Sequence, residues 1–367
     1  MACGEEETTT TAAPATTQAP TTSQAPTTSQ APTTSQAAST TTKPEKAIVL
    51  RVAHTHPVNA PPCIAVAEFV DKFNAEAAGK CVLELHPNQS ILSIPDSFDG
   101  VRTGAVEMAA FPIAIFGSIE PVLNLPEVPF MVNNIQGDAA YNKEMLAIYD
   151  EVLTAKYNMK PLFCFTVGGL EIWTATKPVK TLEDWKGMLT QTISPVTAKV
   201  VEYLGGAGVA VDFLEAYQAM QKRVVDATLQ SPSAVTTLNL QEIVKYATTL
   251  YAVPASVGLF INLDALNKLP ADVRDLLLKV SNEYVTRAND YLVDAVSKDL
   301  QTVIAAGVQV TPLDPQERQR WADKLKPYSE QLLNMVDKGI ADRAREIAKR
   351  VNEQYPYVPG QYPYVVK

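Results

Sequence analysis

Across residues 181–232, apolar runs of strand length alternate with stretches whose apolar residues have helical spacing. Three apolar runs are separated by two amphipathic stretches, and turn residues close the unit at both ends. This alternation is typical of strand–helix–strand units on a parallel sheet. Such sheets bind ligands beyond the carboxyl ends of their strands, which we expect near Gln191, Asp212 and Gln230. The pattern therefore predicts a binding cleft at these three positions.

The first part of the chain carries the same alternation. Residues 47–53 are a continuous apolar run, and residues 63–78 place apolar side chains three and four positions apart. Residues 111–129 are apolar but rich in proline, which predicts a packed irregular segment. The other elements predicted in the two blocks are strands 81–86, 105–110, 160–165, 188–193, 209–211 and 224–229, and helices within 90–104, 138–157, 194–205 and 214–222.

Long amphipathic helices are predicted after residue 264. Val273, Leu277 and Val280 recur at three- and four-residue steps with later apolar residues, so residues 269–307 predict one long helix. A polar break at residues 312–315 precedes a second helical stretch, 316–354.

Two blocks of strand–helix units crossed by a long helix predict an α/β fold with two lobes, mixed sheets and the form of a clamshell. We assign residues 47–168 and about 256–295 to lobe I, and residues 169–255 and about 296–350 to lobe II. The aromatic, proline-rich segment 351–367 is predicted to pack against a lobe as a non-helical tail. A ligand is expected between the lobes.

Composition changes this picture at the N-terminus. Residues 1–46 are almost wholly Thr, Ala, Pro, Ser and Gln, with a repeated APTTSQ, and we expect a disordered stalk there. The net charge of −9 and the absence of a basic stripe argue against nucleic acid as a partner. No apolar run reaches membrane-spanning length.

The four cysteines do not suggest a disulfide framework. Cys63 and Cys81 flank one predicted helix and should lie about 20 Å apart, and Cys164 lies in an apolar strand. Met1-Ala2-Cys3-Gly4 before the stalk resembles the start of a mature bacterial lipoprotein, in which Cys3 would carry the lipid. The alternative is an accidental cysteine in a disordered tail.

Catalytic patterns are weak in this sequence. His54 and His56 would face the same way on an extended segment and could share a metal, but no third ligand stands beside them. Ordinary loop histidines are favoured. The LGGAG run at residues 204–208 is typical of a helix end rather than of a phosphate loop, and no GxSxG is present. The sequence predicts a protein that is not an enzyme.

Several motifs in combination resemble the DctP-type solute-binding proteins of tripartite ATP-independent periplasmic (TRAP) transporters. The resemblance covers residues 48–348. The motifs that carry it are TLEDWKG at 181–187, EAYQAM at 215–220, VVD at 224–226, EIVKY at 242–246, GAVEMA at 104–109 and LPEVP at 125–129.

The resemblance implies a periplasmic-binding-protein clamshell that closes on a small organic solute and passes it to a TRAP membrane permease. With a lipid on Cys3, the protein would be held at the outer face of the cytoplasmic membrane. The alternative function is a ligand-sensing or scaffold module on the tethered stalk.

The sequence departs from the family at the residues that usually grip a ligand carboxylate. Gln191 stands at the position of an arginine, Glu171 at that of a second arginine, and Gln230 at that of an asparagine. An ordinary dicarboxylate is therefore disfavoured. The open alternatives are a neutral or acidic group held by amides, a cationic amine against Glu171 and Trp173, an acid bridged by a metal ion, or a Glu171 that faces solvent.

Other candidate ligand contacts follow from their positions near strand ends. Phe111 and Trp173 are candidates for an aromatic wall of the cleft, although either could be core. Asp212 is a candidate for a ligand contact or a helix cap, and Tyr217 for a contact from the following helix. His54 and Thr55 end the first strand, where the family usually makes contacts.

Overall fold

The structure is a computed structural model that describes residues 47–365. The predictions of a stalk and of a lipid on Cys3 lie outside the described residues.

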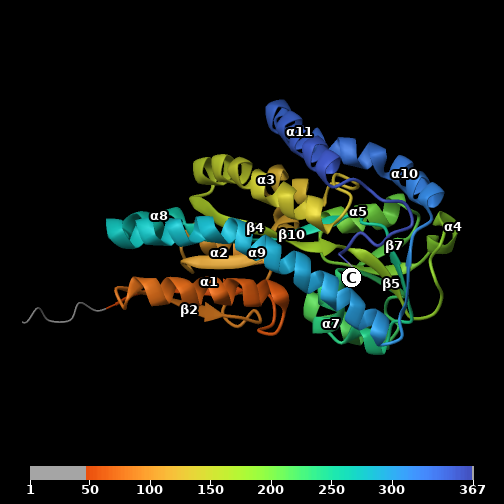
Figure 1. The fold of residues 1–367 in the computed structure, drawn as a ribbon, viewed down its shortest axis with the longest axis horizontal. Helices are drawn as coiled ribbons and strands as arrows, with labels where there is room; N and C mark the ends of the chain where they lie inside the picture. The colour runs from red at the N-terminus through yellow and green to blue at the C-terminus, as the bar shows by residue number, and fades with distance from the viewer. Residues whose placement is uncertain (1–46, 366–367) are drawn as a thin grey trace, which may run out of the picture. The chain divides into compact units, whose positions relative to one another are not determined.

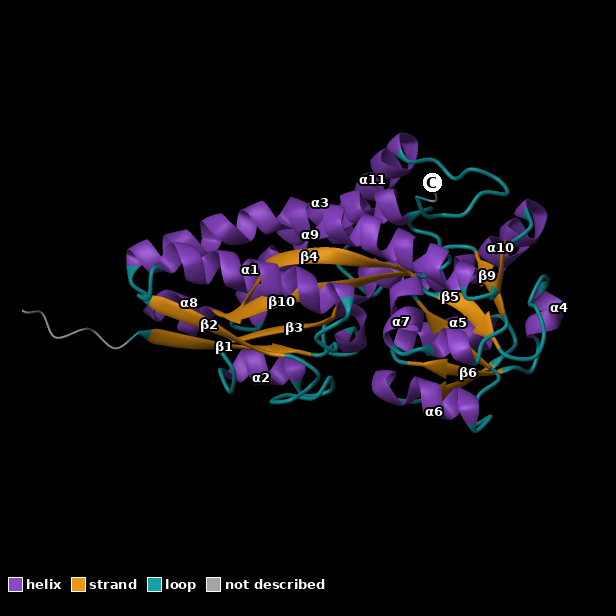
Figure 2. Ribbon diagram, turned by 60° about the horizontal axis from the view of Figure 1, so that its bottom comes forward, coloured by secondary structure: helices purple, strands orange, loops and turns teal. Residues whose placement is uncertain are grey.

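A five-stranded mixed sheet forms the first of two lobes, which we call lobe I (Figure 2). Its order is β2-β1-β3-β10-β4, with β1 parallel to β2 and β3, and β10 antiparallel to β3 and β4. Every residue of β10 is buried, as expected for an interior strand of a sheet covered on both faces. The strands are β1 (Ile48–His54), β2 (Cys81–His86), β3 (Met108–Pro112), β4 (Met159–Gly169) and β10 (Pro254–Asn262).

A six-stranded mixed sheet forms lobe II, with the order β11-β9-β5-β8-β6-β7. The parallel strands β8, β6 and β7 are those of the predicted crossover unit. The pattern missed β5, and it missed β11 because an edge strand of four residues that ends in proline has little strand signal. The strands are β5 (Glu171–Thr174), β6 (Leu189–Thr192), β7 (Ala207–Ala210), β8 (Ala227–Gln230), β9 (Tyr246–Thr249) and β11 (Gln309–Pro312).

Helices cover both sheets, and capping groups in the sequence set several of their starts. Ser194 and Thr197 form a capping box at the start of α5, and Thr181 and Asp184 form another at α4. The α-helices are α1 (Pro61–Ala77), α2 (Ser97–Thr103), α3 (Ile135–Lys156), α4 (Leu182–Trp185), α5 (Pro195–Tyr203), α6 (Ala216–Gln221), α7 (Pro232–Thr237), α8 (Leu263–Lys268), α9 (Ala271–Ala305), α10 (Pro315–Leu333) and α11 (Lys338–Gln354). The 3-10 helices are η1 (Ile113–Phe116), η2 (Pro121–Glu127), η3 (Phe213–Glu215) and η4 (Leu240–Glu242).

The predicted helical stretch 316–354 is divided in two. Asn334 ends α10, and the side chain of Asp337 accepts a hydrogen bond from the amide of Gly339 to start α11. The long helix α9 confirms the prediction for residues 269–307. It packs on β4, α1 and α3 in lobe I and on α7 in lobe II, so it joins the lobes (Figure 1).

Two strand connections also pass between the lobes. A single residue, Leu170, separates β4 from β5, and residues 250–253 separate β9 from β10. A Cβ atom on Gly168 would lie 2.9 Å from Val296 of α9, and one on Gly169 would lie 2.7 Å from the ring of Tyr251. The crossing is packed tightly enough that both positions require glycine.

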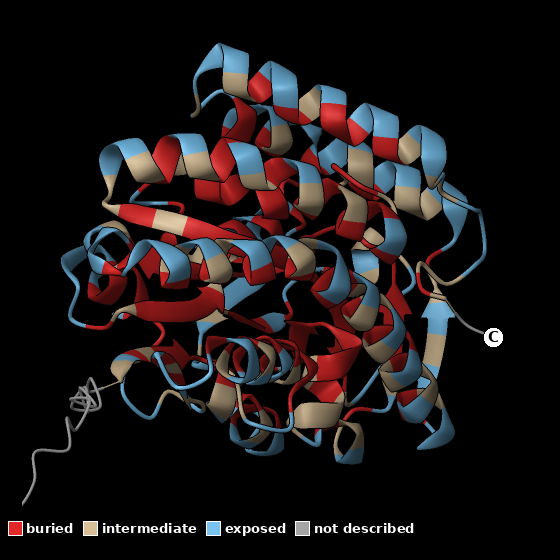
Figure 3. Ribbon diagram, turned by 60° about the vertical axis from the view of Figure 1, so that its left-hand side comes forward, coloured by how far each residue is buried: buried red, intermediate tan, exposed pale blue. Residues whose placement is uncertain are grey.

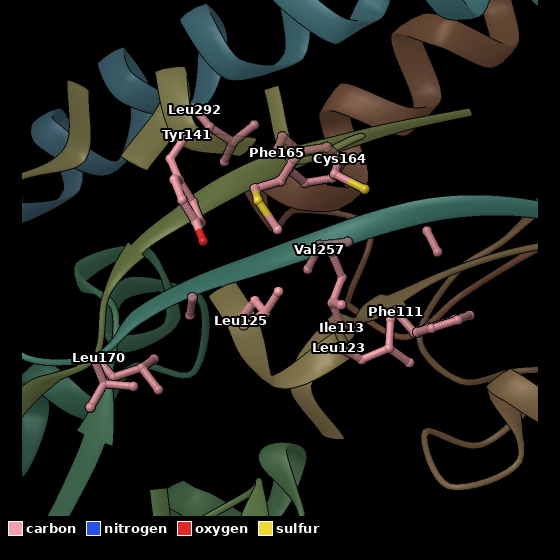
Figure 4. Close-up of a cluster of buried hydrophobic side chains, with 14 of the residues drawn as sticks. Phe111, Ile113, Leu123, Leu125, Tyr141, Cys164, Phe165, Leu170, Val257 and Leu292 are labelled. Atoms are coloured by element: carbon pink, nitrogen blue, oxygen red, sulfur yellow. The ribbon is translucent and has the colours of Figure 1, made fainter. Parts of the chain in front are cut away.

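The buried residues concentrate in the strands and on the inner faces of the helices (Figure 3). Phe111 belongs to this core and lies among the buried side chains of Figure 4. It is fully buried and stacks on Phe260 with ring centroids 4.6 Å apart. It therefore packs in lobe I instead of forming an aromatic wall of the cleft. Cys63, Cys81 and Cys164 are buried free thiols, as predicted. Within residues 47–365, no helix is both long enough and apolar enough to cross a bilayer.

Candidate functional site

A cavity of about 40 Å³ lies between the lobes and is lined by both. Many of its residues lie at or after the carboxyl ends of β1, β3, β6, β7 and β8 or on the strands β4 and β10, and others come from η2 and from the helices α1 and α7. From lobe I they include Thr55, His56, Pro112, Glu127, Val167, Ser256 and Val257, and from lobe II Ile193, Phe213, Gln230, Ser231 and Ser233.

Two contacts between the lobes border this cavity. The rings of His56 and Phe213 lie 5.2 Å apart. The hydroxyl of Ser194, the N-cap of α5, donates a 2.5 Å hydrogen bond to the buried carboxyl of Glu127. Burial raises the pKa of Glu127 to about 7, and the Ser194 hydrogen bond opposes that rise. The lobes are therefore in contact around the cavity, and the arrangement is a closed one.

Gln230 lines the cavity, and Gln191 holds it in place from behind. The side-chain amide of Gln230 donates to the Oε1 atom of Gln191 at 2.9 Å, and the hydroxyl of Thr228 donates to the same atom. The amide nitrogen of Gln191 donates to the carbonyl of Val211 at 3.2 Å. Gln191 is fully buried and does not line the cavity. The structure thus places Gln230 on the cavity wall and Gln191 in support of it.

Trp173 also supports Gln230. Its indole N–H donates to the main-chain carbonyl of Gln230 at 2.8 Å, and the ring is fully buried outside the cavity. Trp173 therefore fixes the backbone at the end of β8 and offers no face to a ligand.

Glu171 lies at the crossing between the lobes, away from the cavity lining. Its carboxyl accepts hydrogen bonds from the amides of Leu250 (2.8 Å) and Tyr251 (3.3 Å) and from the hydroxyl of Tyr364 (2.8 Å). Burial raises its pKa to about 7, and these hydrogen bonds oppose the rise. The expected cradle of Glu171 and Trp173 around a cationic amine does not form in this structure, and Glu171 does not face solvent either.

The histidines after β1 differ in their positions. The amide of His56 donates to Nδ1 of His54 at 3.0 Å, so the proton of His54 is on Nε2, which faces the carbonyl of Pro62 at 3.2 Å. Burial, followed by the neighbouring His56, lowers the pKa of His54 to about 3. Both nitrogens of His54 are occupied, and only Thr55 and His56 reach the cavity. Among residues 47–365, no group of three His, Cys, Asp or Glu side chains is placed to hold a metal.

The two remaining candidates lie outside the cavity. Asp212 is exposed and caps η3 through the amide of Leu214, while its neighbour Phe213 lines the cavity. The hydroxyl of Tyr217 donates to Glu242 at 3.0 Å on the surface of lobe II.

Sequence reasoning missed Glu127, Phe213 and Ser256. Glu127 belongs to the LPEVP motif and Phe213 follows Asp212, so each lay within or beside a stretch already singled out. Ser256 lies in a strand that is buried on both faces, where no alternation marks the side that faces a ligand.

The geometry agrees with a comparison against known families. The model of bacterial extracellular solute-binding proteins, family 7 (DctP), matches residues 52–334, which include both sheets and the cavity. The chain belongs to this family. The predicted resemblance to TRAP solute-binding proteins and the two-lobed α/β fold class are confirmed.

Individual relatives of this family 7 protein match most of the chain in sequence or in fold. The C4-dicarboxylate-binding periplasmic protein DctP of Rhodobacter capsulatus is 26% identical over 294 residues, which are 79% of this chain and 87% of that protein. DctP7, a Bordetella pertussis extracytoplasmic solute receptor that binds pyroglutamic acid, has a TM-score of 0.78 at 20% identity and covers 83% of this chain and 100% of its own. A TRAP periplasmic solute-binding protein from Shewanella oneidensis with bound succinate has a TM-score of 0.75 at 19% identity, covering 82% and 99%.

Proposed function

We propose that this protein captures a small organic solute between its lobes, without converting it chemically, and presents it to the permease of a TRAP-type transporter. The observation that carries the proposal is the cavity at the strand ends, because both lobes supply its walls and its polar groups. Relatives that share the fold bind pyroglutamate or succinate, so a solute of that size is expected here.

Capture requires the lobes to separate and close. In the closed arrangement the cavity has a volume of about 40 Å³, far below the roughly 300–1,000 Å³ of ligand pockets, so the lobes must separate to accommodate such a solute. The two strand connections and α9 join the lobes, and backbone rotation at Leu170 and residues 250–253 would open them as a hinge. A bound solute would then favour the closed form by bridging the two walls.

A thermal-shift screen against small acids, amides, amines and polyols tests the proposal. At least one solute should raise the melting temperature of the wild type, because a ligand that binds only the native state stabilises it. Phe213→Ala removes a ring from the cavity wall and from the contact with His56, so it should weaken the response. Tyr217→Phe removes a hydroxyl on the surface of lobe II and serves as the matched control.

The proposal fails if no solute shifts the wild type, or if Phe213→Ala responds as the wild type does. Association with a membrane protein in the absence of any solute response would favour the sensing or scaffold function instead.

We propose further that a lipid on Cys3 tethers the protein at the outer face of the cytoplasmic membrane. The support is the Cys3-Gly4 pair followed by a Thr/Pro-rich sequence, a composition that suits a spacer between a membrane and a folded body. Cys3→Ser in cells that secrete the full chain should move the protein from the detergent phase to the aqueous phase of a Triton X-114 extract. An unchanged distribution would contradict the anchor.

A further inference from the structure

The cavity has no fixed positive charge. Among its lining residues, all of which the structure describes, none is lysine or arginine. The ionisable side chains that line it are Glu127 and His56, and burial lowers the pKa of His56 to about 4, so its ring is neutral near pH 7. The wall therefore offers hydroxyls, one amide, one neutral imidazole and one acid, between aliphatic residues and the ring of Phe213.

Ser256 is a polar group in this wall without a partner. Its side chain is 3% exposed, and its hydroxyl has no hydrogen bond to any described residue. A buried hydroxyl without a partner costs about 1–3 kcal/mol. Tyr141 and Tyr149 also have unpartnered hydroxyls, but neither lines the cavity. Among the lining residues, Ser256 is thus the one whose buried hydroxyl has no partner.

Gln230 provides a matching group from the other lobe. One N–H of its amide is bonded to Gln191, and its Oε1 atom accepts no hydrogen bond from the described residues. Because Gln191 is itself held by Thr228 and Val211, the plane of the Gln230 amide is fixed. Gln230 and Ser256 together present acceptors and donors of neutral hydrogen bonds.

A carboxylate would meet an unfavourable wall. An ionised carboxylate loses several kcal/mol of hydration on burial, and no cation compensates that loss here. Glu127 in the same cavity would repel it whenever it is ionised. A cationic amine would have Glu127 alone as a counter-charge, and one oxygen of that carboxyl already accepts the hydrogen bond from Ser194.

We propose that the cleft binds an uncharged solute, with an amide, imide or hydroxyl head between Gln230 and Ser256 and an apolar body against Phe213, Val167 and Val257. This inference rests on the proposed function of solute capture. It assigns this chain a ligand class that differs from the acids bound by the relatives compared above.

Isothermal titration calorimetry with full-length protein tests the ligand class through probes that share a skeleton. Succinate, succinamide and 1,4-diaminobutane form one set, pyroglutamate and pyroglutamamide a second, and orotate and uracil a third. In every set that binds, the neutral member should bind at least tenfold more tightly than the charged members. Tighter binding of an acid or an amine would overturn the inference and leave solute capture intact. Failure of all the probes to bind would count against solute capture itself, and the inference would fall with it.

Ser256→Ala tests the site. The substitution removes an unpartnered hydroxyl, so it should leave the melting temperature of the free protein unchanged or raise it slightly. It should also weaken binding of the neutral probe three- to tenfold. Ser281→Ala removes a buried hydroxyl on α9 outside the cavity, so it is the control and should bind within twofold of the wild type. Unchanged affinity in Ser256→Ala would overturn the assignment of the head group to this position.

Discussion

Two clusters of buried polar groups in this molecule differ in how the folded chain satisfies them. At the crossing between the lobes, Asp138 accepts hydrogen bonds from Thr166 (2.6 Å), Asn142 (2.9 Å) and Tyr251 (3.0 Å), and Glu171 accepts three more. In the cleft, the hydroxyl of Ser256 has no partner among the described residues. The comparison teaches that a buried carboxylate near a strand end can be structural, whereas a partnerless group on a cavity wall is available to a ligand.

Among the substitutions considered, removal of a polar group at the crossing between the lobes should lower the free energy of unfolding most. Glu171→Ala would leave the amides of Leu250 and Tyr251 and the hydroxyl of Tyr364 without their acceptor. We expect a loss of about 4 kcal/mol in the free energy of unfolding, summed over these groups. Urea unfolding measures this change.

Glu353→Ala is the matched control, because that glutamate is exposed near the end of α11. Its unfolding free energy should stay within about 0.5 kcal/mol of the wild type. Equal effects of the two substitutions would contradict a structural role for Glu171.

The sequence showed which strand ends lie at the cavity, but it did not always show which side chain at each end faces the cavity. Gln230 and Thr55 line it as expected, but Phe111 and Asp212 each lie one residue from a lining residue, Pro112 and Phe213. Adjacent residues of a strand point to opposite faces, so an uncertainty of one position in β3 exchanges the core residue Phe111 for the lining residue Pro112. Asp212 caps η3 on the surface, and the next residue, Phe213, turns toward the cavity.

Long-range contacts account for the rest of what the sequence could not reveal. Leu250 and Tyr251, which bond to Glu171, lie 79 and 80 residues away in the second crossing, and Tyr364 lies 193 residues away in the C-terminal tail. No local pattern shows that these residues meet. The Glu127–Ser194 contact likewise joins two lobes that are separate in sequence. Periodicity predicts elements, and only the assembled fold shows which buried groups already have partners.

The crossing should also make stability depend on pH. Burial raises the pKa of Glu171 from its usual 4.5 to about 7, so the unfolded chain loses this proton at a lower pH than the folded chain does. The contribution of the protonated carboxyl is complete below about pH 4.5 and is lost as the pH rises through 7. A shift of this size corresponds to about 3 kcal/mol.

Glu171→Gln stays uncharged in both states and should decline less in stability between pH 4.5 and 7 than the wild type does. Urea unfolding at several pH values measures the difference. A residual decline is expected from Asp138, whose pKa burial also raises to about 7. Parallel curves for the two proteins would refute the assignment to Glu171.

Because the crossing between the lobes is closely packed, Gly168→Ala should also lower the free energy of unfolding, by less than Glu171→Ala does. Gly168 and Gly79 both have positive φ, 93° and 81°, but a Cβ atom on Gly168 would meet Val296 at 2.9 Å, and one on Gly79 would meet nothing within 4 Å. Both alanine variants carry the backbone strain of about 1 kcal/mol. Gly168→Ala should lose about 2 kcal/mol more by thermal or urea unfolding. Equal losses would show that the crossing is not tightly packed.

A substitution behind the cleft should change the affinity for a ligand rather than the stability of the fold. Gln191→Arg places a guanidinium directly behind Gln230, and we expect the affinity for succinate to rise about tenfold, equivalent to about 1.4 kcal/mol. Calorimetry measures the change, and circular dichroism confirms that the variant is folded. A folded variant with unchanged preference between succinate and succinamide would show that position 191 does not control the charge of the ligand.

The central claim is that a neutral solute occupies the cleft and satisfies the groups that the fold leaves free. A crystal structure with the probe of highest affinity tests it most directly. We expect an uncharged molecule between the lobes, with its head within hydrogen-bond distance of the Gln230 side chain and of Ser256 Oγ. A carboxylate held there through a metal ion, or a solute bound instead in the separate pocket lined by Arg318 and Tyr357, would contradict it.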